Sequence, residues 1–143
     1  MPAATRREAR EHALSLAYER DVRALPADEL LSELLAPPDA YAVTLVAGID
    51  EHRDEIDALL ERFSEHWSLE RMPVIDRTLL RLATYELTHE LDVPTAVVIT
   101  EAVELAKQYS TKDSGRFVNG LLSRVAAEVR LDEVHPVEDP GLS

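Results

Sequence analysis

Apolar residues recur at intervals of three and four positions along most of this 143-residue chain. That spacing places apolar side chains along one face of an α-helix, because a helix turns once every 3.6 residues. The clearest examples are Ile75, Leu79, Leu82 and Ala83, followed by Val118, Leu121, Leu122 and Val125. The alternating pattern of a half-buried strand is almost absent, so the sequence predicts an all-α protein without a sheet.

Prolines and helix-capping residues divide the chain into helix-length segments. Thr5 and Glu8 have the spacing of a capping box, which satisfies amide groups at the start of a helix. Pro37 and Pro38 end a short segment, and Asp39 is suited to cap the next one. The predicted helices cover residues 5–20, a short stretch after Pro26, and residues 39–49, about 55–63, 73–91, 95–109 and 114–130. We therefore expect a single compact domain of six or seven short helices over residues 1–134, followed by a disordered tail at residues 135–143.

The composition excludes several classes of protein. There is no cysteine, which removes disulfide frameworks, thiolate zinc sites and cysteine nucleophiles. No apolar stretch approaches the roughly 20 residues that cross a bilayer, and no apolar segment follows the basic residues near the start, as it would in a secretory signal. We therefore expect a cytoplasmic protein that has no membrane association and no cofactor.

Charge is distributed unevenly in this acidic chain, whose formal net charge is −13. Such a total argues against nucleic-acid binding, because phosphate is repelled. Yet residues 105–124 carry four basic residues and one acid, and residues 1–10 carry three arginines and one acid. Solvated helix faces are one interpretation. The alternative is an RNA-binding surface, since Tyr18 lies near the first basic group, while Tyr109 and Phe117 flank the second. A core position is the competing interpretation of Tyr18 and Phe117.

Motifs for catalysis or metal binding are scarce. The chain has no glycine-rich phosphate loop, nucleophile elbow or two-histidine metalloprotease helix. Glu86 and His89 have a spacing found in di-iron bundles, but those bundles need two such pairs and further glutamates. A second pair, Asp132 and His135, lies beside the tail. We therefore predict no metal site and no enzymatic activity. Gly120 lies inside a helical segment and is expected to mark the close approach of another helix, with contact by a partner as the alternative.

Four ordered segments of the chain resemble the bacterial NusB family of transcription antitermination factors. They are Arg6–Glu11 with Ala17 and Tyr18, Asp76–Leu87, Val93 and Pro94 with Val98–Lys107, and Asp113–Leu122. Their order and spacing match the family over nearly the whole chain. The resemblance implies an all-helical fold of two small subdomains that binds the boxA element, a single-stranded RNA, of nascent ribosomal RNA leaders. It also implies a heterodimer with NusE, a small-subunit ribosomal protein, which joins the elongating RNA polymerase through other Nus factors.

The resemblance also assigns roles to individual residues. The family's two RNA-contacting regions correspond to Arg6, Arg7 and Arg10, and to Asp113, Ser114, Arg116 and Phe117. To these the pattern of charges and aromatic rings adds Lys112 and Tyr18 as RNA contacts. Asp76 corresponds to an acidic position at the NusE interface.

Two positions depart from the family. Thr95 stands where an aromatic residue can occur, and Thr100 stands where asparagine is common, so a base-stacking contact is expected to be missing at Thr95. The acidic total charge predicts weak RNA binding by the chain alone and tighter binding with NusE. Two other functions stay open: a structural helical adaptor or homodimer without an RNA role, and the detached N-terminal domain of a ribosomal RNA methyltransferase.

Overall fold

The computed structural model describes residues 5–65 and 67–130, and every regular element in these two ranges is helical. The elements are α1 (Arg6–Arg23), α2 (Ala27–Ser32), α3 (Ala40–Glu51), α4 (Arg53–Phe63), the 3₁₀ turn η1 (Leu69–Arg71), α5 (Val74–His89), α6 (Thr95–Tyr109) and α7 (Lys112–Val129). The all-α prediction is confirmed. Within the described ranges, no helix combines the length and the apolar character needed to cross a bilayer. The predicted tail at residues 135–143, and the Asp132–His135 pair, lie outside the described residues.

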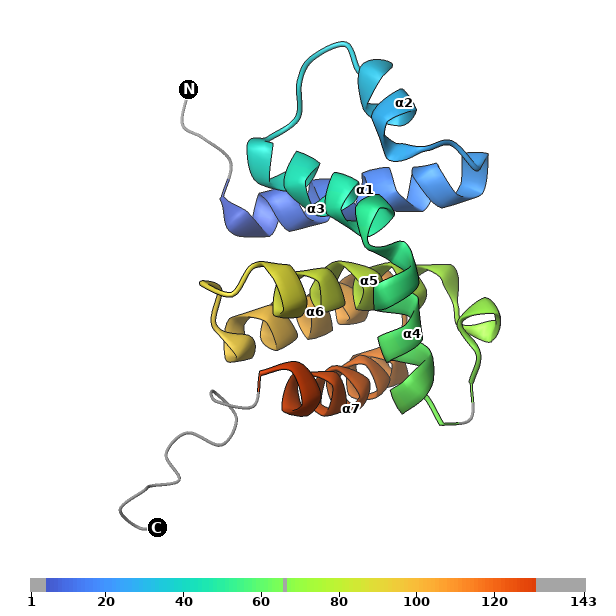
Figure 1. The fold of residues 1–143 in the computed structure, drawn as a ribbon, viewed down its shortest axis with the longest axis vertical. Coiled ribbons are helices and arrows are strands. Elements are labelled where there is room, and N and C mark those ends of the chain that lie inside the picture. Colours follow the sequence, from blue (N-terminus) through green and yellow to red (C-terminus); the bar gives the residue numbers. More distant parts are fainter. Residues whose placement is uncertain (1–4, 66, 131–143) are drawn as a thin grey trace.

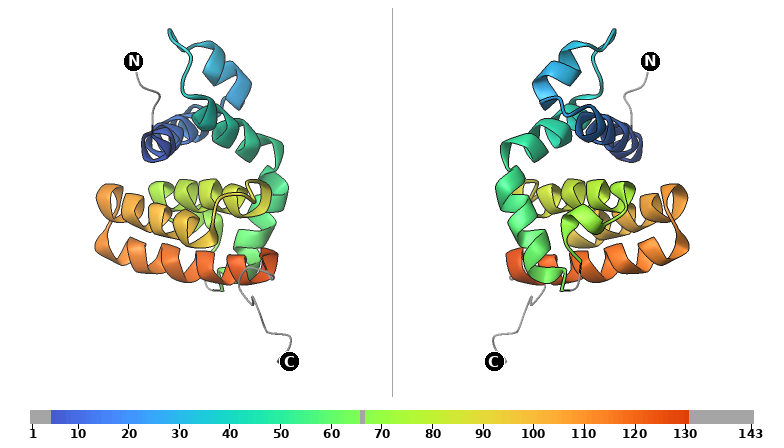
Figure 2. Two further views of the ribbon diagram at one scale, coloured as in Figure 1. Left: turned by 90° about the vertical axis from the view of Figure 1, so that its left-hand side faces the viewer. Right: turned by 90° about the vertical axis from the view of Figure 1, so that its right-hand side faces the viewer.

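The helices form two groups that meet at α5. Helices α1, α2 and α3 lie together in the upper part of Figure 1, and α5, α6 and α7 lie together beneath them. Helix α4 leaves the end of α3 and runs down beside the lower group to reach α7, as both views in Figure 2 show. Because α5 contacts α1 and α3 as well as α4, α6 and α7, it connects the two groups. This arrangement agrees with the two helical subdomains that the resemblance implied.

One apolar core extends through both groups. Its largest fully buried leucines and isoleucines come from α2, α3, α4, α5 and α7, and they are Leu30, Leu45, Ile49, Ile56, Leu60, Leu79, Leu80, Leu87, Leu121 and Leu122. Gly48 allows α3 to approach α5, because a Cβ atom at this position would collide with the ring of Tyr85. Gly120, in contrast, has no neighbouring atom within 4 Å of the place where its Cβ would lie. The predicted close helix contact at Gly120 is therefore wrong.

Capping chemistry sets the ends of the helices. The capping box of Thr5 and Glu8 is present at the start of α1, and the Asp39 carboxylate accepts an amide at the start of α3, so both predicted starts are confirmed. Helix α1 continues past residue 20 to Arg23, and the short helix predicted after Pro26 is α2, which ends at Ser32. The periodic pattern thus located the helices, but not every terminal residue.

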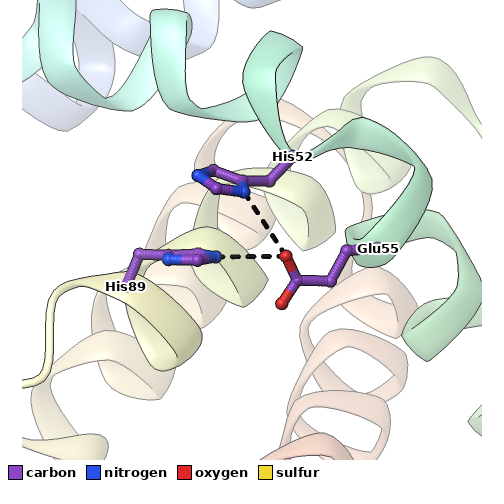
Figure 3. A group of neighbouring side chains, drawn as sticks. All are labelled: His52, Glu55 and His89. Carbon is purple, nitrogen blue, oxygen red and sulfur yellow. Dashed lines mark hydrogen bonds and ion pairs between the residues drawn. The ribbon is translucent and has the colours of Figure 1, made fainter.

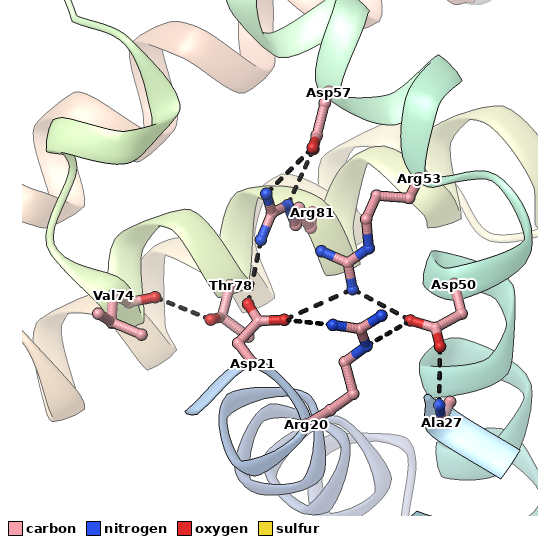
Figure 4. A network of polar contacts seen from close by, with 9 residues as sticks. All are labelled: Arg20, Asp21, Ala27, Asp50, Arg53, Asp57, Val74, Thr78 and Arg81. Atoms are coloured by element: carbon pink, nitrogen blue, oxygen red, sulfur yellow. Dashed lines mark hydrogen bonds and ion pairs between the residues drawn. The ribbon is translucent and has the colours of Figure 1, made fainter. Parts of the chain in front are cut away.

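A network of three arginines and three aspartates holds the two groups of helices together (Figure 4). Its members are Arg20 and Asp21 on α1, Asp50 on α3, Arg53 and Asp57 on α4, and Arg81 on α5. Arg81 donates to Asp57 at 2.8 and 3.0 Å, and to Asp21 at 3.0 Å. Because each arginine in this network is paired with a carboxylate, the three side chains stabilise the contacts between the helices.

Asp50 has a second role in this network, as the acceptor for the first amide of α2. The Ala27 amide donates to Asp50 at 2.7 Å, whereas the preceding Pro26 offers no side-chain cap. Burial raises the pKa of the Asp50 carboxyl, but the Ala27 amide and two guanidinium groups outweigh burial. The pKa of Asp50 therefore lies below its ordinary value, and the carboxylate is the form that the fold requires.

Candidate nucleic-acid interface

Arg10 lies inside the protein rather than on its surface. Its side chain is 7% exposed, and it donates to the Glu86 carboxylate from Nε at 3.0 and 3.1 Å and from Nη2 at 2.8 Å. The Tyr41 hydroxyl donates to the same carboxylate, and burial together with this contact raises the pKa of the Tyr41 phenol. To contact RNA, the Arg10 guanidinium would have to leave Glu86, and the buried carboxylate would lose its countercharge. This position therefore does not support the predicted RNA contact of Arg10.

Arg6 and Arg7 are exposed, but other side chains engage both. The Arg6 guanidinium lies 3.8 Å from the centre of the Tyr41 ring, which turns it toward α3. Arg7 donates two hydrogen bonds of 2.8 Å to Glu101 on α6, and this contact lowers the pKa of Glu101. Arg6 and Arg7 therefore point in different directions, and Arg7 is the one that is bonded to α6.

The turn between α6 and α7 is built on buried hydrogen bonds. The Thr111 hydroxyl accepts the Ser114 amide, so α7 begins at Lys112 rather than at the predicted Ser114. The Ser114 hydroxyl donates to Asp76 Oδ2 at 2.8 Å, and both residues are buried. Their burial does not support the predicted contacts of Asp76 with NusE and of Ser114 with RNA. Instead, the two side chains hold the start of α7 against the start of α5.

Basic residues on both sides of this turn line a shallow hollow of about 370 Å³ between α6 and α7. The hollow is lined by Val103, Lys107, Lys112, Gly115, Arg116 and Asn119. Gly115 lets the stem of Lys107 lie close to α7, since a Cβ atom there would be 3.1 Å from Lys107 Cγ. Asp113 is exposed and lies 3.5 Å from Arg116, an exposed pair that restrains the arginine weakly. The hollow therefore presents cationic groups to solvent.

Aromatic side chains lie on both sides of the turn. Tyr18 and Tyr109 are 41% and 47% exposed, and with Ile75 they line a groove of about 320 Å³ where α1 meets α5 and α6. Phe117 is half-buried, and its ring centre is 5.7 Å from that of Trp67, which is 47% exposed. Tyr18 is thus not a core residue. Trp67 is not among the predicted contacts, because nothing in the sequence of its loop links it to α7.

The two basic groups lie near one another in the fold. Arg7 is bonded to Glu101 in the middle of α6, and the Tyr109 hydroxyl at the end of α6 lies 3.4 Å from Glu11 Oε2. Helix α1 therefore crosses the part of α6 that leads into the turn, and Figure 2 shows α1 above these helices. Glu11 and Glu101 stand between the basic groups, so the surface is not continuously positive.

The two threonines that depart from the family do not line the basic hollow. Thr95 begins α6, at the end opposite the turn, and its hydroxyl accepts a hydrogen bond of 3.2 Å from Arg130. Arg130 also donates to the Leu87 carbonyl at 2.9 Å, which fastens the end of α7 to the end of α5. Thr100 is exposed on α6. The missing aromatic ring at Thr95 therefore leaves the rings beside the turn unaffected.

Comparisons with known proteins agree with one another. A model of the NusB family matches residues 7–127. The transcription antitermination protein NusB of Kineococcus radiotolerans is 47% identical over 127 residues, which are 86% of this chain and 93% of the relative. That of Salinispora arenicola is 48% identical over 133 residues, covering 88% and 96%. The solved structure of T. maritima NusB has a TM-score of 0.83 at 38% identity, covering 94% of this chain and 99% of the other. A crystal structure of the antitermination factors NusB and NusE in complex with dsRNA has a TM-score of 0.75 at 32% identity, covering 86% and 96%.

Proposed function

The chain belongs to the NusB family, and we propose that it acts as a transcription antitermination factor that binds boxA RNA of nascent ribosomal RNA leaders together with NusE. Its similarity to a solved complex of NusB, NusE and RNA supports this function. In this role it is a cytoplasmic binding protein rather than an enzyme, and it reaches the elongating RNA polymerase through other Nus factors. The observation that carries the proposal is the basic hollow beside the α6–α7 turn, with exposed aromatic rings close by.

This surface has the chemistry that a single RNA strand requires. Lys107, Lys112 and Arg116 line one hollow, so they are placed to neutralise neighbouring phosphates. Tyr109 and Phe117 lie on the helices that form the turn, where they offer ring surface to unstacked bases. The Ser114–Asp76 hydrogen bond contributes indirectly, because it fixes the turn that carries these groups.

The same geometry gives NusE a role in affinity. Arg7 is paired with Glu101 and Arg10 is buried, so the chain alone presents fewer cations than its sequence suggests. A basic partner beside the hollow would increase the number of phosphates that are neutralised together. We therefore expect RNA to bind weakly to the chain alone and more tightly to its complex with NusE.

The test compares two double variants that each remove two positive charges. Lys112→Ala with Arg116→Ala changes the hollow, whereas Arg23→Ala with Arg62→Ala removes exposed arginines elsewhere. The dissociation constant is measured by fluorescence anisotropy of a labelled boxA oligonucleotide with NusE over a salt series. The hollow variant should bind about tenfold more weakly or worse, and its slope of log affinity against log salt should fall by about 1.4, because each phosphate contact on a single strand contributes about 0.7.

The control variant should keep the wild-type slope. Equal losses in the two variants would mean that total charge alone governs binding, and the surface assigned here would be wrong. The same titration without NusE should show weaker binding by the wild-type protein. An affinity that does not change when NusE is left out would contradict the joint mechanism.

A further inference from the structure

Two histidines and a glutamate from three helix ends meet at the opposite end of α5 from the α6–α7 turn (Figure 3). His52 joins α3 to α4, Glu55 lies in the first turn of α4, and His89 is the last residue of α5. Glu55 Oε1 lies 3.4 Å from His52 Nδ1 and 3.3 Å from His89 Nε2. His89 is thus associated with α4 rather than with Glu86, which is buried against Arg10.

The three possible ligand atoms are close to the spacing of a tetrahedral metal site. Zinc binds histidine nitrogen and carboxylate oxygen at about 2.0–2.2 Å, so neighbouring ligand atoms lie roughly 3.3–3.5 Å apart. Both distances to Glu55 Oε1 fall in or near that range, and all three ligand atoms lie within 4.8 Å of one another. Backbone rearrangement is therefore not needed to bring them around one ion.

The two imidazole rings need a change of orientation to bind. They are stacked, with ring centres 3.8 Å apart and planes inclined by 21°, and a shared ion requires both lone pairs to converge on one point. The side chains of His52, Glu55 and His89 are 29%, 50% and 28% exposed, so they have room to rotate. Binding is thus expected to separate the stacked rings.

We propose that His52, Glu55 and His89 form a binding site for a divalent transition-metal ion, for which zinc is the best-suited candidate. Two imidazoles and one carboxylate form a donor set that zinc uses, with the fourth position open to water. Magnesium and calcium prefer sites made entirely of oxygen ligands, so they fit this donor set poorly.

The surroundings of the cluster also favour a cation. His52 and Glu55 line an open hollow of about 310 Å³ at the α3–α4 junction, where Asp50, Glu51 and Asp54 outnumber the one cation, Arg53, which is itself paired with Asp50. The Glu51 carboxylate lies 3.8 Å from His52 Nε2, the ring nitrogen that faces away from Glu55. At that distance the contact is electrostatic rather than a hydrogen bond, and the negative charge of the carboxylate favours a bound cation nearby.

A bound ion would add a further connection between parts of the fold that packing and the arginine–aspartate network already hold together. Its ligands come from the α3–α4 junction and from the end of α5, and these segments belong to the two groups of helices described above. Because the ligands are dispersed in the unfolded chain, metal binding should stabilise the folded protein. The site is distant from the basic hollow, so the proposal does not depend on RNA binding.

The experiment uses the full chain without a histidine tag and follows its melting temperature during zinc titration, with isothermal titration calorimetry for stoichiometry. We expect one zinc ion per chain and a rise in Tm of roughly 5–10 °C at a hundredfold excess over the dissociation constant. His52→Gln and His89→Gln should each weaken binding at least about tenfold. His12→Gln removes an exposed histidine of α1 and should bind zinc as the wild type does.

Cobalt provides an independent readout of the same ligands. The visible spectrum of the Co²⁺-loaded wild-type protein should indicate low-symmetry four- or five-coordinate cobalt with nitrogen ligands, and the double variant His52→Gln with His89→Gln should lose that spectrum. The proposal is overturned if zinc up to about 100 μM leaves the wild-type Tm unchanged. It is equally overturned if the double variant keeps the wild-type affinity, or if magnesium displaces zinc at similar concentrations.

Discussion

Replacing Arg10 with methionine tests whether this arginine stabilises the fold or contacts RNA. Methionine keeps an apolar stem of similar length but removes the guanidinium. Among the described residues, Tyr41 then remains as the hydrogen-bond donor to the buried Glu86 carboxylate. The two partners of the ion pair are 7% and 3% exposed, so solvent cannot replace the lost contacts. Breaking a pair this buried costs about 3–5 kcal/mol, because one charge is left uncompensated.

That loss is large compared with the stability of a small domain, which is about 5–15 kcal/mol. For a chain of this length it corresponds to a fall in Tm of roughly 10–15 °C. The assay is urea unfolding followed by far-ultraviolet circular dichroism, with Arg6→Met as the control, because Arg6 is exposed and its contact with the Tyr41 ring is worth about 1 kcal/mol or less.

A double variant separates loss of the ion pair from loss of packing. Arg10→Met with Glu86→Leu removes both charges, so it should recover most of the stability that Arg10→Met alone loses. If Arg10→Met instead remains within about 0.5 kcal/mol of the wild type while RNA affinity falls, Arg10 is free to turn outward and the structural role argued here is wrong.

Three further substitutions test the glycines and the Asp50 cap. Gly120→Ala should stabilise the protein by about 0.5–1 kcal/mol, because the added methyl group meets open space. Gly48→Ala should destabilise it by about 1–3 kcal/mol, because the Tyr85 ring must move. Urea unfolding measures the free energy of unfolding of both variants. Asp50→Asn should cost about 1–2 kcal/mol at pH 7. Because the folded-state pKa of Asp50 is the lowered one, its contribution is complete above the unfolded-state pKa and disappears as the pH falls through the folded-state value. The stability difference between wild type and Asp50→Asn should therefore shrink below about pH 4, and a constant difference down to pH 2 would contradict this account.

Local sequence patterns predict this fold well, because most of its helices are amphipathic and their ends carry recognisable chemistry. The Thr5–Glu8 box and the Asp39 cap depend on residues two or three positions apart, so the sequence contains the whole interaction. The start of α7 was misplaced for a related reason. Thr111 is its cap, but Ser114 also has a residue type that caps helices, and the competing contact of Ser114 with Asp76 comes from a helix 38 residues away.

Site residues were predicted less well, because a sequence match identifies residues and not the direction in which they point. Successive residues on a helix are rotated by 100°, so Arg6 and Arg10 share a side of α1 near Tyr41 while Arg7 turns toward α6. The burial of Arg10 depends on Glu86 and the pairing of Arg7 depends on Glu101, and both glutamates lie far along the chain. The exposed groups at the α6–α7 turn were predicted correctly as a basic group, since they are neighbours in sequence as well as in space.

The Glu86 and His89 side chains have different partners in the fold, for the same physical reason. The Glu86–His89 spacing suggested a pair on one helix face, but Glu86 reaches into the core, and the last turn of α5 brings His89 to Glu55 on another helix. The net charge of −13 is a poor guide to RNA binding for a similar reason. Many of the arginines are paired with carboxylates inside the fold, as in the network around Arg81, so these pairs contribute little field outside it. A phosphate strand responds to the charges nearest to it, and at the α6–α7 turn the cations Lys107, Lys112 and Arg116 outnumber the exposed Asp113. The distribution of charge, rather than its sum, therefore decides where an acidic protein of this kind can hold RNA.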